Sequence, residues 1–271
     1  MDTNNGRIAL ITGASSGIGR STAIALREAG YRVYGTSRRG AKAGQYSFDM
    51  LALDVTDDAS VVAAVKELMQ REGRIDLLVN NAGVGIAPAA AEESTLSQVQ
   101  TIFQTNVFGT VRVTQAVLPH MRAQRSGRIL NVGSALGLIP APFNTHYSAA
   151  KHAIEGYSES LDHEVRGFGI RISVIEPGAT STSFEGSAIQ PDKPLIAYDA
   201  LREKYLIAFN QTMAQADTAD SVAQTIVEAA LDQQSLLRYP SGKVAKQGAF
   251  ARRFLPRSLF DKTLHKQFGL A

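Results

Sequence analysis

The residues best suited to chemistry in this sequence gather between positions 134 and 151. Tyr147 and Lys151 are four residues apart, so in a helix they lie on one face and the ammonium can approach the phenol. A free tyrosine has a pKa of about 10, and a neighbouring positive charge lowers that pKa. Ser134 lies on the segment that leads into the same helix. The group predicts proton transfer to or from an alcohol or carbonyl oxygen.

The composition limits the classes of protein in which such a group can occur. The spacing of Tyr147 and Lys151 also arises by chance on amphipathic helices. Whether the two residues form a site must therefore be judged from the elements around them. The chain has 271 residues, of which 44% are hydrophobic and 20% charged, as in a globular domain. It has no cysteine, which excludes disulfides and thiolate metal sites, and no metal site is predicted. The apolar run at residues 8–11 is too short for a signal sequence or a membrane span, and a cytoplasmic location is expected.

A glycine turn follows the first predicted strand, at residues 7–12, and precedes a helical pattern that continues to residue 29. Its glycines are spaced Gly-x-x-x-Gly-x-Gly rather than Gly-x-Gly-x-x-Gly. Such glycines permit tight backbone angles and the close approach of a pyrophosphate, which the positive end of the following helix stabilises. A simple tight loop is the alternative, but the position directly after the first strand favours a dinucleotide site.

The second predicted strand, residues 31–36, ends in Ser37-Arg38-Arg39. An acidic residue at this place would bind the ribose 2′-hydroxyl of NAD, whereas arginine pairs with a 2′-phosphate. The sequence therefore predicts NADP. Two solvated arginines at a strand end are the alternative.

Five further strands are predicted at residues 50–53, 75–79, 128–132, 170–175 and 236–239. Asp54 follows the first of these and could bond an adenine or help to cap the next helix. The next strand runs into Asn80-Asn81-Ala82-Gly83, where the asparagines can lock a turn. Ser134 lies just beyond the end of the strand at 128–132, where ligands bind in open α/β sheets.

Helical patterns fill most of the remaining chain. A long helix is predicted over residues 96–122, with Asn106 among its apolar residues. An unbonded asparagine is costly there, so it either satisfies a backbone irregularity or serves the site. Two more helices are expected near residues 198–214 and 218–231, after a loop of small and polar residues at 179–192.

Taken in order, these motifs resemble the short-chain dehydrogenase/reductase family over roughly residues 6–240. The motifs are Thr12-Gly-x-x-x-Gly-x-Gly19, Asn80-Asn-Ala-Gly83, Asn106, Ser134, Tyr147-x-x-x-Lys151 and Pro177-Gly178. The resemblance implies an α/β, doubly wound Rossmann fold with a seven-stranded parallel sheet. A single domain is expected at residues 1–240, followed by a basic amphipathic extension at 241–271.

The resemblance also implies a catalytic tetrad of Asn106, Ser134, Tyr147 and Lys151. In that family the tyrosine is the acid/base and the serine hydrogen-bonds the substrate oxygen. The lysine lowers the tyrosine pKa and holds the nicotinamide ribose, and the asparagine orders a proton-relay water.

The family places its cofactor along several of these motifs. The glycine turn contacts the pyrophosphate, Asp54 lies near the adenine, and the Asn80 region runs along the cofactor. A threonine after Pro177-Gly178 lies near the carboxamide; Thr180 and Thr182 compete for this role, and Thr182 is preferred. The expected cofactor-binding residues are Gly13, Ser15, Ser16, Gly17, Ile18, Gly19, Ser37, Arg38, Asp54, Val55, Asn80, Ala82, Gly83, Tyr147, Lys151, Pro177, Gly178 and Thr182.

Within the family, Gly133-Ser134 and Pro142-Phe143-Asn144 resemble the hydroxysteroid and retinol dehydrogenase-like branch. The implied function is an NADP-dependent oxidoreductase that exchanges a hydride between nicotinamide and a secondary alcohol or ketone. Many relatives have Ser-Ser where this chain has Gly133-Ser134, and some NADP users carry a basic residue in place of Ser16. A sugar-nucleotide epimerase is disfavoured by the glycine spacing and Asn106, and a non-catalytic NADP-binding sensor by the intact tetrad.

Apolar residues near the tetrad favour a lipophilic small-molecule substrate, although they could also be ordinary core. They are Leu136, Leu138, Ile139, Pro140, Pro142, Phe143 and Phe184. His146 is expected to be a neighbour exposed to the pocket or solvent rather than a catalyst. A homo-oligomer is expected, with no nucleic-acid partner.

The segment at residues 239–271 contains seven basic residues and one acidic residue. Phe260, Leu264 and Phe268 recur every four residues, so one helical face is expected to be apolar and the other basic. The apolar face could pack over the pocket or a partner subunit, or rest on an anionic membrane surface. Packing on protein is preferred, because three apolar residues with Pro256 make a modest anchor.

Overall fold

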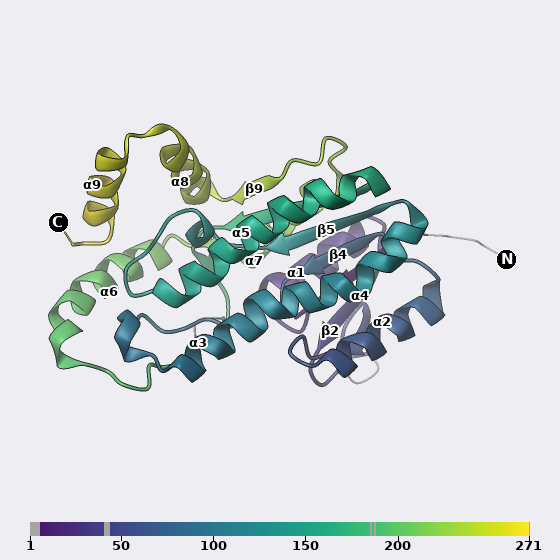
Figure 1. Ribbon diagram of the computed structural model, residues 1–271, viewed down its shortest axis with the longest axis horizontal. Helices are drawn as coiled ribbons and strands as arrows, with labels where there is room; N and C mark the ends of the chain where they lie inside the picture. Colours follow the sequence, from purple (N-terminus) through teal and green to yellow (C-terminus); the bar gives the residue numbers. More distant parts are fainter. Residues whose placement is uncertain (1–5, 41–43, 185, 187, 271) are drawn as a thin grey trace.

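A seven-stranded, wholly parallel sheet with the order β3-β2-β1-β4-β5-β6-β9 forms the middle layer of the molecule (Figure 1). The structure is a computed structural model that describes residues 6–40, 44–184, 186 and 188–270, so the polar residues 1–5 lie outside it. All seven predicted strands are confirmed within two residues at each end. They are β1 (Ile8–Ile11), β2 (Arg32–Ser37), β3 (Asp49–Ala52), β4 (Leu77–Asn80), β5 (Gly127–Val132), β6 (Ile170–Pro177) and β9 (Arg238–Ser241).

Helices cover both faces of the sheet, because the strands are apolar on both sides. Ile8 and Leu10 of β1 join one buried cluster, whereas Ala9 and Ile11 join the other. The first cluster packs under α2 (Asp58–Glu72), α4 (Gly109–Gln124) and α5 (Thr145–Val165). The second packs under α1 (Gly17–Glu28) and α7 (Ala219–Leu231), which lie behind the strands in Figure 1. This is the doubly wound arrangement, in which the strand order reverses between β1 and β4 and opens a crevice at the carboxyl ends.

The long helix predicted over residues 96–122 is interrupted. It consists of α3 (Leu96–Phe103), a π-helical turn (Gln104–Phe108) and α4, with Asn106 in the π turn. Such π turns occur frequently at functional sites.

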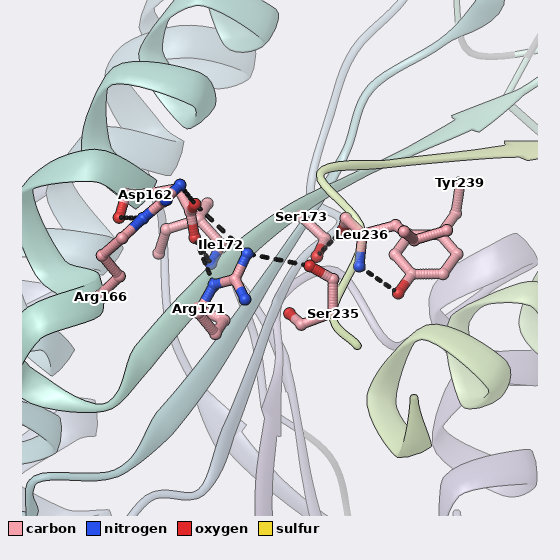
Figure 2. A network of polar contacts seen from close by, with 8 residues as sticks. All are labelled: Asp162, Arg166, Arg171, Ile172, Ser173, Ser235, Leu236 and Tyr239. Carbon is pink, nitrogen blue, oxygen red and sulfur yellow. Dashed lines mark hydrogen bonds and ion pairs between the residues drawn. The ribbon is translucent and has the colours of Figure 1, made fainter. Parts of the chain in front are cut away.

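The helix that carries Tyr147 and Lys151, α5, is fixed to the sheet near its other end (Figure 2). Buried Asp162 accepts hydrogen bonds from the Arg171 guanidinium at 2.9 Å and from the Ile172 N–H at 3.0 Å. Arg171 also donates to the carbonyl of Ser235, on the approach to β9. Helix α5 therefore has a set position relative to β6 and β9.

The last part of the chain forms a helical layer at the end of the molecule opposite the N-terminus (Figure 1). Its helices are α6 (Asp199–Met213), α8 (Lys243–Phe254) and α9 (Arg257–Gln267). The loop predicted at residues 179–192 includes a short strand, β7 (Thr180–Ser181), which pairs with β8 (Asp217–Thr218). No helix in the described part of the chain is both long enough and apolar enough to cross a bilayer.

Candidate active site

Ser134, Tyr147 and Lys151 come together at the carboxyl end of β5. The strand ends at Val132, and Ser134 begins a 3-10 turn (Ala135–Gly137) that leads to α5. The Nζ atom of Lys151 donates to the carbonyl of Val132 at 2.9 Å and lies 5.6 Å from the centre of the Tyr147 ring. The Ser134 hydroxyl lies close enough to the Tyr147 phenol to lower the pKa of the phenol in part. The main-chain carbonyl of β5 thus fixes the cation beside the phenol, as the four-residue spacing predicts.

The electrostatics of this group differ from the sequence expectation that Lys151 lowers the pKa of Tyr147. Burial of the phenol hydroxyl raises the pKa of Tyr147 to about 12, and the hydrogen bond with Ser134 opposes this only in part. Burial also lowers the pKa of Lys151 to about 8, against the opposing charge of Glu155. Desolvation is the largest cause of both shifts, and it favours the protonated form of the phenol.

The hydroxyl of Ser134 is oriented by its own backbone. Its oxygen accepts a hydrogen bond from the Leu136 N–H at 3.1 Å. This leaves the hydroxyl hydrogen available for an oxygen at the site, either the phenol or a substrate carbonyl. Ser134 is therefore suited to act as a donor.

Asn106 is buried and bonds the segment after β4 through both ends of its side chain. Its Oδ1 accepts from the Val84 N–H at 2.8 Å, and its Nδ2 donates to the Val84 carbonyl at 2.9 Å. Asn106 therefore joins the π turn to the segment that follows β4.

The glycine turn is held against the end of β4 by two residues. Thr12 Oγ1 accepts from the N–H groups of Asn81 and Ala82 at 2.9 and 3.0 Å. The side-chain amide of Asn81 donates to the carbonyls of Thr12 and Gly13. A Cβ on Gly19 would lie 2.4 Å from both Asn81 Nδ2 and the Gly13 oxygen, so no larger residue fits. Sequence reasoning left Thr12 and Asn81 out of the cofactor set; the Asn-Asn pair after a buried strand was the available signal.

The turn and the first residues of α1 fit a bound pyrophosphate. Gly13 and Gly17 have φ values of 68° and 52°, in the left-handed region that favours glycine. Ser16 is the N-cap of α1 but makes no side-chain cap bond, and the first turn has no acidic residue. The N–H groups between Ser15 and Gly19, including that of Ile18, therefore suit an anion.

The end of β2 presents positive charge. Arg38 is exposed and, within the described residues, forms no ion pair. Ser37 Oγ donates to the Gly40 carbonyl at 2.8 Å, which shapes the turn beside it. The hydrogen bond from the Thr56 N–H lowers the pKa of Asp54, and the nearby charge of Arg38 adds to this effect. The N-cap of α2 is Asp57, so the prediction that Asp54 helps to cap this helix is wrong. The Asp54 carboxylate instead accepts from the Thr56 N–H and closes a turn.

The side chain of Asn80 has a different place from the one expected. It is buried and donates to Thr114 Oγ1 at 3.0 Å and to Asn131 Oδ1 at 2.9 Å, between the sheet and α4. It therefore connects elements in the interior and does not face the crevice. Val55 is also buried, and its carbonyl accepts from Arg112. Gly83 lies against Asn106, where a Cβ would come within 3.2 Å of Oδ1.

Beyond β6, the two candidate threonines occupy different places. Pro177 ends the strand, and the Gly178 N–H donates to the Ser241 carbonyl. Thr180 belongs to β7 and bonds back to the Gly178 carbonyl. Thr182 lies against the glycine turn, since a Cβ on Gly17 would come 3.4 Å from its Cβ. This contact favours Thr182 for the cofactor role.

Two of the residues predicted to form apolar pocket walls, Phe184 and Phe143, differ in their surroundings. Phe184 packs edge-on against Tyr147 with ring centres 6.2 Å apart, so it belongs to the site. Phe143 is 5% exposed and packs with Tyr205, so it is core and its assignment as a pocket wall is wrong. His146 lies 3.0 Å from the carbonyl of Ala91, outside the reacting group. The described residues contain no cluster suited to a metal ion.

Comparison with known proteins places these features in a family. Residues 7–193 match the family model described as short chain dehydrogenase. The chain is 46% identical over 178 residues to 3-ketodihydrosphingosine reductase from Bacteroides thetaiotaomicron, a match that covers 66% of this chain and only 65% of that protein. It is 37% identical over 272 residues to 17-beta-hydroxysteroid dehydrogenase type 1 from Mus musculus, covering 92% of this chain and 75% of that enzyme.

Solved structures agree with the fold and with nucleotide binding. A short-chain dehydrogenase from Streptomyces avermitilis superposes with a TM-score of 0.83 at 33% identity, and 95% of each chain is covered. Two others have TM-scores of 0.73 and 26% identity: a 3-ketoacyl-(acyl-carrier-protein) reductase from Brucella melitensis complexed with NADH, and ElxO with NADP bound. They cover 88% and 89% of this chain, and 96% and 99% of their own.

Proposed function

This chain belongs to the short-chain dehydrogenase family, and from that premise we propose that it is an NADP-dependent oxidoreductase acting between a secondary alcohol and a ketone. The observation that carries the proposal is the grouping of Ser134, Tyr147 and Lys151 at the end of β5, with the Lys151 ammonium held by the Val132 carbonyl 5.6 Å from the centre of the Tyr147 ring. The alternatives of an epimerase and a sensor gain no support from the relatives.

In the proposed reaction Tyr147 moves the proton. Bound nicotinamide supplies the hydride. Because burial keeps the pKa of Tyr147 near 12, the phenol is a proton donor at neutral pH and can protonate the substrate oxygen as a ketone is reduced. Ser134 donates a hydrogen bond to the same oxygen and stabilises the charge that develops there.

Lys151 and Asn106 support the reacting pair. One hydrogen of the Lys151 ammonium is committed to the Val132 carbonyl, which leaves two for the hydroxyls of a cofactor ribose. Both ends of the Asn106 side chain bond Val84, so we assign the ordering of a relay water to main-chain carbonyls of the π turn. In this proposal the Asn106 side chain fixes the position of the π turn through its two hydrogen bonds to Val84.

The choice of NADP rests on Arg38, whose exposed guanidinium is suited to a 2′-phosphate. A lipophilic ketone as substrate is supported by Phe184 beside Tyr147. Relatives named for a ketodihydrosphingosine and for a hydroxysteroid fit the same substrate class. We also propose a cytoplasmic location and a homo-oligomeric state, as the sequence predicts.

The test is turnover with a panel of carbonyl compounds, run once with NADPH and once with NADH. The panel contains a steroid ketone, a long-chain 3-ketone and an open-chain sugar, and cofactor binding is measured separately by fluorescence. We expect NADPH oxidation with the lipophilic ketones and little with the sugar. Tight NADPH binding without turnover of any panel member would point to a sensor, and preference for the sugar would contradict the proposed substrate class.

A further inference from the structure

One face of α8 combines positive charge with exposed aromatic rings. Lys243, Lys246 and Phe250 follow one another at intervals of three and four residues, and Arg253 and Phe254 lie three and four residues beyond Phe250. The five residues therefore share one side of the helix, here named the α8 outer face. Phe250 is 63% exposed and Phe254 is 60% exposed, with their rings 4.7 Å apart. A solvated helix face is ordinarily polar, so a pair of exposed phenylalanines indicates a surface that meets something other than water.

The opposite side of α8 is packed tightly, so the helix cannot turn these rings inward. Ala245 is buried. Gly248 lies so close to Ile139 that a Cβ would come 2.2 Å from its Cδ1. Ile139 follows the 3-10 turn that Ser134 begins, and its N–H bonds the carbonyl of Ala135. Helix α8 therefore rests directly on the segment next to the catalytic serine.

The apolar face predicted from the sequence is a different one, and it is used within the protein. Phe260 and Leu264 of α9 are buried, and the Phe268 ring lies 5.9 Å from that of Tyr205 on α6. The Arg252 guanidinium lies 5.3 Å from the Phe260 ring and joins α8 to α9. The apolar face of α9 thus packs on the protein, as preferred from the sequence. The α8 outer face, in contrast, stays open to solvent.

The positive charge of the α8 outer face indicates which kind of partner can bind there. Helix α8 contains no acidic residue, and within the described residues Lys243, Lys246 and Arg253 form no ion pair. A second copy of the same face would bring like charges together. A nucleic-acid duplex would neutralise the cations but leave the phenylalanines exposed, because its bases are stacked inside the helix. An anionic bilayer matches both features, because its surface attracts the cations and the rings can insert below the headgroups.

We propose that the α8 outer face docks this protein reversibly on anionic lipid bilayers. Docking places the segment from Ser134 to Ile139 beside the membrane surface, with α8 between the site and the lipid. The docking does not depend on the proposed reaction, because it rests on charge and exposed apolar area alone.

The test is sedimentation of the full-length protein with phosphatidylcholine vesicles, with and without phosphatidylserine. We expect binding only to the anionic vesicles, and loss of binding in high salt. The double substitution Phe250→Ser/Phe254→Ser should weaken binding about tenfold, since partial burial of two rings is lost. Lys243→Gln/Lys246→Gln should weaken it by a similar factor.

Matched controls separate the face from the general surface. Phe168→Ser removes an aromatic residue that is 40% exposed in the turn after α5, and Arg27→Gln removes an exposed cation of α1; neither should change binding. All variants must keep the melting temperature and NADPH affinity of the wild type to enter the comparison. For any that does not, Phe250→Ala/Phe254→Ala and Lys243→Ala/Lys246→Ala take its place, because alanine removes the same ring or charge and favours a helix. Equal sedimentation with neutral vesicles, or unchanged binding in the phenylalanine variants, would overturn the proposal. Dissociation of an oligomer in those variants would assign the face to a second copy instead.

Discussion

Arg38 and Asp54 lie close together at the carboxyl ends of β2 and β3, where an adenosine ribose would bind. Asp54 is engaged in a turn with Thr56, whereas the Arg38 guanidinium has no ion-pair partner among the described residues. An unpaired arginine can form charge-assisted hydrogen bonds with a 2′-phosphate, each contributing roughly 1.5–3 kcal/mol. Removing Arg38 and placing an acidic residue at the neighbouring position should therefore reverse the preference for NADPH over NADH.

We predict that Ser37→Asp/Arg38→Leu lowers kcat/KM with NADPH by about tenfold or more and raises the relative use of NADH. Arg39→Leu, an exposed neighbour, is the matched control and should have a smaller effect. The measurement is kcat/KM with both cofactors for each variant. Equal use of NADH and NADPH by the wild type would contradict the assignment of Arg38.

Two adjacent residues of the same type, such as Asn80 and Asn81, can have different roles, and this limits what a sequence can predict. Asn80 points into the interior toward Thr114, whereas Asn81 holds the glycine turn. Strand alternation indicates that adjacent side chains face opposite ways, but not which of them faces the crevice. The pKa of Tyr147 likewise depends on burial, and four-residue spacing to Lys151 carries no information about burial.

At the level of elements, the junction between β1 and α1 is where the backbone leaves least room. Gly19→Ala would force a contact of 2.4 Å with the Gly13 carbonyl, and relieving it should strain the turn by about 1–3 kcal/mol. We predict that NADPH affinity falls at least about tenfold. A fluorescence titration measures this effect.

Gly156→Ala in α5 is the control for that substitution. Its added Cβ would meet no atom within 4 Å, and alanine favours a helix interior by roughly 0.5–1 kcal/mol, so this variant should bind NADPH normally and melt higher. If Gly19→Ala binds NADPH as well as Gly156→Ala does, the turn does not hold the pyrophosphate.

The strands and most helices could be predicted because their apolar patterns are long and regular. The π turn at Gln104–Phe108 could not, since Asn106 is its one buried polar residue and the partner of that residue, Val84, is distant in sequence. The pairing of β7 with β8 was equally out of reach, because each strand has two residues and carries no periodicity.

Over the whole molecule, buried charge should make stability depend on pH. Glu176 is 1% exposed, and burial, together with the charge of Glu155, raises its pKa from 4.5 to about 8, although Arg238 lies 3.5 Å away. Between these two values the folded state keeps a proton that the unfolded state loses. The contribution of Glu176 to the free energy of unfolding therefore falls as pH rises from 4.5 to 8.

We predict that Glu176→Gln removes this fall. Its free energy of unfolding relative to the wild type should increase between pH 5 and pH 8.5, by an amount on the order of a few kcal/mol. Urea denaturation at several pH values measures the difference, and Glu159→Gln, on the exposed side of the same arginine, is the control. Parallel curves for Glu176→Gln and the wild type would show that Glu176 is ionised in the folded protein.

The central claim is that Tyr147 transfers the substrate proton, and it is tested most directly by kcat of Tyr147→Phe with a lipophilic ketone that the wild type reduces. Tyr157→Phe, also on α5 but packed against the hydrophobic core, serves as the control. We predict that Tyr147→Phe loses at least about 100-fold in kcat while its NADPH affinity stays within about twofold of the wild type, and that Tyr157→Phe keeps its activity. A Tyr147→Phe variant that retains more than about a tenth of wild-type kcat would contradict the assignment of the proton donor.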